Sequence, residues 1–236
     1  MASWMVHLRI ADNLLSQIPN LSETEFIVGN IAPDSGVPNE DWTSFTPSAA
    51  ISHYRRDSGE KVGKKIDLSA YIRQYFTPEQ QKAYSGGQYA FYLGYLTHLL
   101  TDILWADKIA LPSFRKHIGE NASVKNPLVP KIKDDWYDLD FLFLREHPDF
   151  HAFAVYESAV GFENTYMTEF APDAFDNRRV YITSFYREPN GHLDREYPYL
   201  TKGEMDTFVE NSTEEIIRIL KNDYGVTTGR LEVAGV

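Results

Sequence analysis

The chain has no cysteine among its 236 residues. Without thiols it can form no disulfide bond, no cysteine nucleophile, no iron–sulfur cluster and no thiolate zinc site. The absence of cysteine also agrees with a reducing compartment. A metal site in this chain would therefore have no thiolate ligand.

Basic residues are in the minority. The sequence has 23 Lys and Arg against 34 Asp and Glu, a formal net charge of −11. Proteins that act mainly on nucleic acid need a basic surface to displace counterions. We therefore expect no nucleic acid as the main partner, whereas an acidic chain is compatible with a carboxylate-rich metal site.

Long uninterrupted apolar runs are also missing. The amino terminus has no positively charged region followed by an apolar core, which argues against a secretory signal. The most apolar stretch, 89–110, contains His98, Asp102 and Asp107, so we expect a buried helix with no transmembrane segment. Together these features predict a cytoplasmic protein. The sequence also lacks a phosphate-binding glycine loop and a serine nucleophile elbow.

Helical patterns dominate what is present. Apolar spacing and capping patterns predict helices near 4–18, 23–30, 88–109, 131–146 and 201–222. The run from Val180 to Tyr186 is the one strand-like segment. We predict an all-α, mainly helical single domain over residues 1–236, with a small strand-like or loop-rich insertion toward the C-terminus.

His98 and Asp102 are the most informative pair. Four residues apart on a helix, they share one face, and that face is apolar. A buried carboxylate is costly unless a cation or hydrogen bonds accompany it. The pair is therefore either a hydrogen-bonded histidine and aspartate inside the core or part of a metal site.

Three more residues have the right chemistry. His7 lies on the apolar stripe of the first helix, His53 lies in a short apolar segment, and Asp34 follows Ile31-Ala32-Pro33. Each alone also fits a core histidine or an ordinary turn. The whole set is a cysteine-free ligand group suited to zinc, iron or manganese, and it comprises His7, Asp34, His53, His98 and Asp102.

Asp134 and Asp138 form a second carboxylate pair at the same four-residue spacing. They could be metal ligands, or an acidic helix start favoured by the helix dipole. Asp107 is a weaker candidate of the same kind.

Four segments resemble the zinc-dependent phospholipase C family, which is related to the P1-type nucleases. They are Ser3-Trp4-Met5-Val6-His7, Gly29-Asn30-Ile31-Ala32-Pro33-Asp34, Ser52-His53-Tyr54 and, above all, Gly94-Tyr95-Leu96-Thr97-His98-Leu99-Leu100-Thr101-Asp102. The resemblance covers residues 3–145. It implies an all-helical domain that holds up to three zinc ions at the bottom of a cleft and hydrolyses phosphodiesters.

The resemblance also implies a ligand set. Asp34, His53, His98 and Asp102 match the first zinc site of the family, and His7, with Asp102 bridging, matches part of another. Secreted members use the amino group and carbonyl of a processed N-terminal tryptophan, whereas Trp4 is internal here. The family's His-x-x-x-Glu pair is replaced by Asp134 and Asp138. We therefore expect two or three zinc ions, with iron or manganese as alternatives.

The expected function is a metal-dependent hydrolase of phosphate esters, a phospholipase C-like phosphodiesterase that uses a metal-activated water. Asp34 would be a ligand or the base that orients this water. Trp4, Tyr95 and Trp105 are expected to line the cleft and bind substrate, a small phosphate ester or a phospholipid head group. The alternative is a non-catalytic metal-binding protein of the same fold with a structural or partner-binding role. Residues 171–236 would form a lid or an interface, which is compatible with a homo-oligomer.

Overall fold

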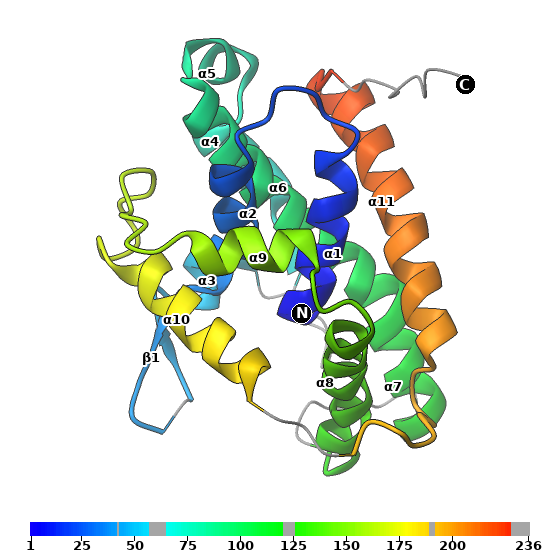
Figure 1. Ribbon diagram of the computed structural model, residues 1–236. Helices are drawn as coiled ribbons and strands as arrows, with labels where there is room; N and C mark the ends of the chain where they lie inside the picture. The colour runs from blue at the N-terminus through cyan, green and yellow to red at the C-terminus, as the bar shows by residue number, and fades with distance from the viewer. Residues whose placement is uncertain (42, 57–64, 120–125, 189–191, 228–236) are drawn as a thin grey trace, which may run out of the picture.

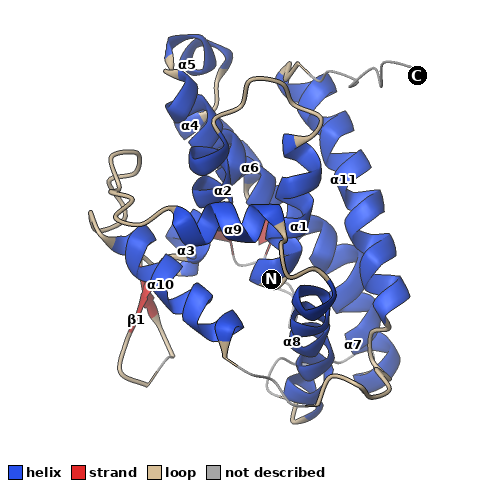
Figure 2. Cartoon of the chain, in the orientation of Figure 1, coloured by secondary structure: helices blue, strands red, loops and turns tan. Residues whose placement is uncertain are grey.

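The computed structural model describes residues 1–41, 43–56, 65–119, 126–188 and 192–227. It is mainly α-helical (Figure 2), which confirms the predicted fold class. The helices outside the central helix and its extension are α1 (Trp4–Leu15), α2 (Glu23–Ile31), η1 (Ala32–Asp34), α3 (Ala49–Ser52), α4 (Leu68–Tyr75), α5 (Pro78–Ala83), α8 (Leu128–Glu146), α9 (His151–Ser158), α10 (Ala174–Arg187) and α11 (Lys202–Tyr224).

The β-structure is confined to two short antiparallel pairs in the N-terminal half of the described chain. β1 (Val37–Pro38) pairs with β2 (Phe45–Thr46), and β3 (Arg55–Arg56) pairs with β4 (Lys65–Ile66). They flank α3 on either side in the sequence, and so border the segment that carries His53.

The strand prediction for Val180–Tyr186 was wrong, because this run lies inside helix α10. Its β-branched and aromatic residues favour strands locally. Phe175, Ile182 and Tyr186 are nevertheless buried at helical spacing, so packing against the rest of the fold overrides the local preference.

The central helix is α6 (Gly86–Trp105), whose start is fixed by a reciprocal capping box between Ser85 and Gln88. It continues through a π-helical turn (η2, Ala106–Ala110) into α7 (Leu111–Ile118). Nearly every residue of α6 from Ala90 to Trp105 is buried. This agrees with the predicted buried helix, and no described helix is long and apolar enough to cross a membrane.

Helices α2 and α6 approach each other very closely through two glycines. A Cβ atom on Gly29 would fall within 3.0 Å of the Phe91 backbone, and one on Gly94 would do the same with the backbone of Phe26. Because neither glycine has a side chain, the backbones touch, and the carbonyl of Asn30 comes within hydrogen-bond distance of the His98 ring.

Helix α1 lies in the middle of the bundle (Figure 1) and contacts α2, α6, α9 and α11. This position makes most of its residues inaccessible to solvent, including His7, which is completely buried. Helices α1 and α6 therefore place His7 and His98 inside the protein, next to each other.

Candidate metal centre

Five side chains from separate parts of the chain meet beside α6. His7 comes from α1, Asp34 from η1, His53 from the end of α3, and His98 and Asp102 from α6. They form two groups whose ligand atoms lie within 4.8 Å of one another, His7–His98–Asp102 and Asp34–His53–His98. His98 belongs to both groups, so the predicted set of five is brought together as one cluster.

The hydrogen bonds of His98 determine which of its nitrogens is free. Nδ1 lies 2.7 Å from the carbonyl oxygen of Asn30. Since a carbonyl can only accept, Nδ1 carries the hydrogen and Nε2 is left with a lone pair. Nε2 of His98 lies 3.3 Å from Nε2 of His53. The His7 ring stacks on the His98 ring, with 3.8 Å between the ring centroids.

Asp102 lies at the centre of the cluster. Its Oδ1 accepts a 2.9 Å hydrogen bond from the amide of Ala2 and lies 3.6 Å from Nε2 of His7. Its Oδ2 lies 3.9 Å from Nε2 of His53 and 4.0 Å from Nε2 of His98.

Several of these buried polar atoms are unsatisfied. Among the described residues, Oδ2 of Asp102 and both ring nitrogens of His7 have no hydrogen-bond partner. A buried donor or acceptor left without a partner costs about 1–3 kcal/mol. Imidazole nitrogens and carboxylate oxygens are zinc ligands, so the donor set fits a bound metal that would satisfy these atoms.

Protonation states also suit metal binding. Burial, followed by the neighbouring His7, lowers the pKa of His98 to about 3, so its ring is neutral at physiological pH. Burial alone would raise the pKa of Asp34, but its hydrogen bond to His53 and the nearby histidines outweigh this and lower it. The pKa of Asp102 is likewise lowered despite burial, chiefly by the amino terminus and His7. Neutral imidazoles beside ionised carboxylates are the forms that bind metal.

A cleft of about 1110 Å³ opens over the cluster, and Asp34, His53 and Asp102 are among its lining residues. Trp4, Phe45 and Trp136 contribute apolar surface to the same cleft. The cluster is thus reached from a space large enough for a small molecule.

A sequence model of the zinc-dependent phospholipase C family matches residues 6–221. The chain belongs to this family. No curated protein and no solved structure matches it. The match extends well past residue 145, so α10 and α11 belong to the phospholipase C domain as well. Family membership and the His/Asp cluster support a metal-dependent, phospholipase-like hydrolase.

Of the three aromatic residues expected to line the phospholipase C cleft, only Trp4 is found there. Tyr95 and Trp105 are fully buried. The Tyr95 hydroxyl donates to the carbonyl of Ser52, and Trp105 packs edge-on against Trp136 at 5.2 Å between ring centroids. Both are core residues because they project from faces of α6 that other elements cover. Helical spacing alone does not tell a face that borders the cleft from a face that is packed in the core.

The second carboxylate pair is not brought to the cluster. Asp134 is exposed, and Asp138 lies 2.7 Å from Nη2 of Arg195. The same arginine also contacts Asp135, which is buried. Asp107 lines the cleft but belongs to neither of the two groups of potential ligands among the described residues.

Sequence reasoning did not single out four residues that contact the cluster or line the cleft. Asn30 orients His98, and Arg55 lies 3.6 Å from Oδ2 of Asp102. Lys133 and Arg178 line the cleft. Two signals were available: Arg55 lies two residues after His53, and Asn30 lies in one of the segments that resemble the family. The positions of Lys133 and Arg178 depend on contacts between distant segments.

The C-terminal region contributes to the body of the domain. α11 packs against α1 and α6, and α10 packs against α9. Arg178 of α10 and Glu215 of α11 line the cleft. A role for residues 171–236 as a lid or an interface stays a prediction.

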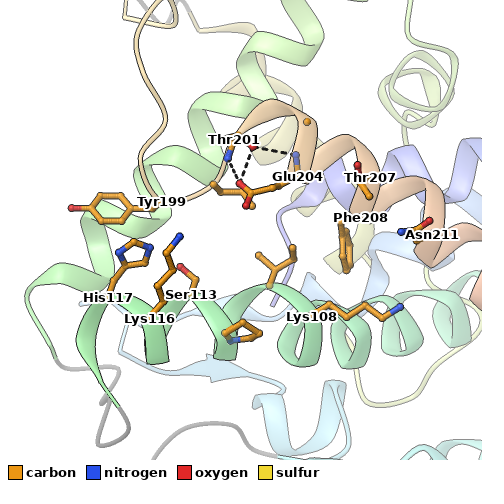
Figure 3. Close-up of a pocket in the computed structure, with 14 residues that line it drawn as sticks. Lys108, Ser113, Lys116, His117, Tyr199, Thr201, Glu204, Thr207, Phe208 and Asn211 are labelled. Atoms are coloured by element: carbon orange, nitrogen blue, oxygen red, sulfur yellow. Dashed lines mark hydrogen bonds between the residues drawn. The ribbon is translucent and has the colours of Figure 1, made fainter.

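A second, smaller groove of about 620 Å³ lies between α7 and the start of α11 (Figure 3). Lys116 and His117 project from α7 on one side, and on the other side Glu204 bends back to Thr201 in the capping box of α11 (Figure 3). None of the described groups of potential metal ligands includes a residue of this groove. Both described groups that could hold a metal instead include residues that line the larger cleft.

Proposed function

We propose that this family member is a metal-dependent phosphodiesterase of the phospholipase C type. Its expected ligands are His7, Asp34, His53, His98 and Asp102, which would hold at least two zinc ions. The observation that carries the proposal is the set of unsatisfied ligand atoms on His7 and Asp102, buried beside an open cleft. Two overlapping ligand groups that share His98 support more than one ion.

When bound, the metal supplies a Lewis acid and a water of lowered pKa. Asp34 is the residue best placed to handle the proton of the attacking water. Its side chain is only 8% exposed yet lines the cleft, and its Oδ1 is engaged with Nε2 of His53 at 3.1 Å. Its lowered pKa keeps the carboxylate ionised at neutral pH, which is the form that a metal ligand or a group orienting the water needs.

The remaining residues hold this arrangement in place. Asn30 sets the tautomer of His98 through the 2.7 Å hydrogen bond, and Ser52 lies 2.9 Å from Nδ1 of His53. Such partners of metal-binding histidines keep the rings oriented. Arg55, near Asp102, adds positive charge where a phosphoryl group would bind.

The test combines metal analysis with an activity assay. Protein purified without added metal or chelator is analysed for zinc, iron and manganese, and is assayed with bis(p-nitrophenyl) phosphate. We expect two or more equivalents of metal and hydrolysis that a chelator abolishes. His98→Ala should lose both, whereas His151→Ala, which changes an exposed histidine paired with Asp12, should lose neither.

Circular dichroism of His98→Ala separates a lost ligand from a lost fold. Metal in the wild type without hydrolysis of any phosphate ester would favour the non-catalytic alternative. Absence of metal from both proteins, even after reconstitution, would contradict the proposed function.

A further inference from the structure

Arg178, on α10, is a nearly buried cation in the wall of the cleft. It is 7% exposed, and its Nη2 donates a 2.6 Å hydrogen bond to the carbonyl of Gly36. No described carboxylate lies within ion-pair distance of it. Buried arginines are almost always paired with an anion, and the open cleft is where such an anion could bind.

Lys133, on α8, is a second cation of the cleft without a carboxylate partner in the described part of the chain. Lys133 as a residue is exposed, but partial burial of its amino group and, after it, the charge of Arg55 lower the pKa of that group. Like charges held near each other repel, and an anion between them would remove this repulsion.

The other charged residues of the cleft do not cancel these cations. Glu215 is paired with Lys108, and Lys65 and Asp107 offset each other. Asp34 and Asp102 belong to the ligand cluster, whose bound metal would more than offset their charge. With metal bound at Asp34 and Asp102, the walls of this cleft would therefore be cationic, although the chain as a whole has a net charge of −11.

We propose that the cleft takes a phosphodiester whose head group carries a second negative charge, and that Arg178 and Lys133 supply the complementary charge. The assignment of the scissile phosphate to the His/Asp cluster rests on the proposed function. Recognition of the second anion does not, because it uses side chains outside the cluster. A zwitterionic head group such as phosphorylcholine would bring its ammonium cation toward these cations and bind less well.

The experiment measures binding in the absence of hydrolysis. Isothermal titration calorimetry compares inositol 1,4-bisphosphate with phosphorylcholine, using metal-free and zinc-loaded protein. We expect the bisphosphate to bind at least 10-fold more tightly to the zinc-loaded protein, with a smaller preference in the metal-free protein, where Asp34 and Asp102 keep their negative charge. The preference should shrink as ionic strength rises.

Lys133→Gln is the main variant, because Lys133 is exposed enough for the fold to tolerate the change. It should weaken bisphosphate binding about 10-fold, equivalent to about 1.4 kcal/mol, and change phosphorylcholine binding less than about 2-fold. Lys131→Gln is the matched control: it removes the same charge from an exposed position of the same helix that does not line the cleft. Its affinities should equal those of the wild type.

Arg178 is tested by a pair of variants, because its bond to Gly36 also has a structural role. Arg178→Lys keeps the charge and should retain most of the bisphosphate preference, whereas Arg178→Gln should lose it. Equal losses in both variants would assign Arg178 to structure alone.

The outcomes separate this inference from the proposed function. Bisphosphate selectivity that depends on Lys133, in a protein that hydrolyses no phosphodiester, would uphold the anion site and contradict the phosphodiesterase. Equal binding of the two ligands, or equal effects of Lys133→Gln and Lys131→Gln, would overturn the anion site whatever the activity.

Discussion

Helices α8 and α6 each carry a pair of potential metal ligands at the same four-residue spacing, but the two pairs differ in whether protein groups satisfy their carboxylates. Asp134 and Asp138, like His98 and Asp102, lie four residues apart on a helix. Asp138 and its neighbour Asp135 are bound by Arg195, and Asp135 also accepts backbone hydrogen bonds from Tyr199 and Leu200. Protein groups therefore satisfy this site.

The cluster around Asp102 is different. Oδ2 of this carboxylate lies 3.6 Å from Arg55 but has no hydrogen-bond partner among the described residues. The two ring nitrogens of His7 are also buried without such a partner. A buried carboxylate needs a partner. Where protein groups donate hydrogen bonds to all of its oxygens, we infer a structural role. Where a buried oxygen has no donor, we infer that a bound ligand such as a metal ion contacts it. Spacing selects candidates, and the partner of each carboxylate tells them apart.

The largest expected effect tests this contrast directly. Asp102→Asn keeps the shape of the side chain but removes its charge. We expect loss of bound metal and a fall in phosphodiester hydrolysis of at least about 100-fold. This fall would exceed the effect of changing a residue that contacts only the ligands and not the metal. Asp138→Asn should leave metal content and activity unchanged. Metal lost from Asp138→Asn and kept in Asp102→Asn would reverse our assignment of the two sites.

A stability measurement examines the satisfied site. Asp135→Ala removes the 2.7 Å contact with Arg195 and the acceptor of two backbone amides. We expect the free energy of unfolding, measured with urea, to fall by about 2–3 kcal/mol, with metal content unchanged. A variant that is as stable as the wild type would show that this pairing contributes nothing to the fold.

Asp140 is a buried carboxylate of a third kind, because it stays protonated to a higher pH than an ordinary aspartate. Burial raises its pKa to about 7, against the opposing hydrogen bonds from Tyr186 and Ser3. The unfolded chain loses this proton near pH 4 and the folded protein near pH 7, so stability falls as pH rises through this window, by about 1 kcal/mol per pH unit.

Urea unfolding of chelator-treated protein at several pH values from 4.5 to 7.5 measures this slope. Asp140→Asn, which cannot ionise, should show a flatter dependence than the wild type. Parallel curves for the two proteins would mean that Asp140 is ionised in the folded state throughout.

The smallest effect is expected at Asp134, which is exposed. Asp134→Asn should change the free energy of unfolding by less than about 0.5 kcal/mol and leave metal content as in the wild type. Loss of a metal equivalent in this variant would restore Asp134 as a ligand and require α8 to move toward the cluster.

Much of this molecule could be predicted from local patterns. The apolar pattern predicted the central helix, and the four-residue spacing of His98 and Asp102 put them on one face. His7 was recognised because a histidine on an apolar stripe points inward. These inferences hold because the α-helical repeat fixes the directions of neighbouring side chains whatever the rest of the chain does.

Other properties were decided only when distant segments packed together. Arg195 binds Asp138 from 57 positions further along the chain. Contacts with the rest of the fold made a helix of Val180–Tyr186 and put Tyr95 and Trp105 in the core. Local spacing carries no information about such partners.

The sequence by itself thus determined the helical class of this protein and the residues of its candidate metal centre. Only the tertiary structure decided which carboxylates have protein partners, which aromatic residues reach the cleft, and where Arg178 and Lys133 lie. The physical reason is that side-chain direction along a helix is a local property, whereas burial and pairing depend on what packs against that helix.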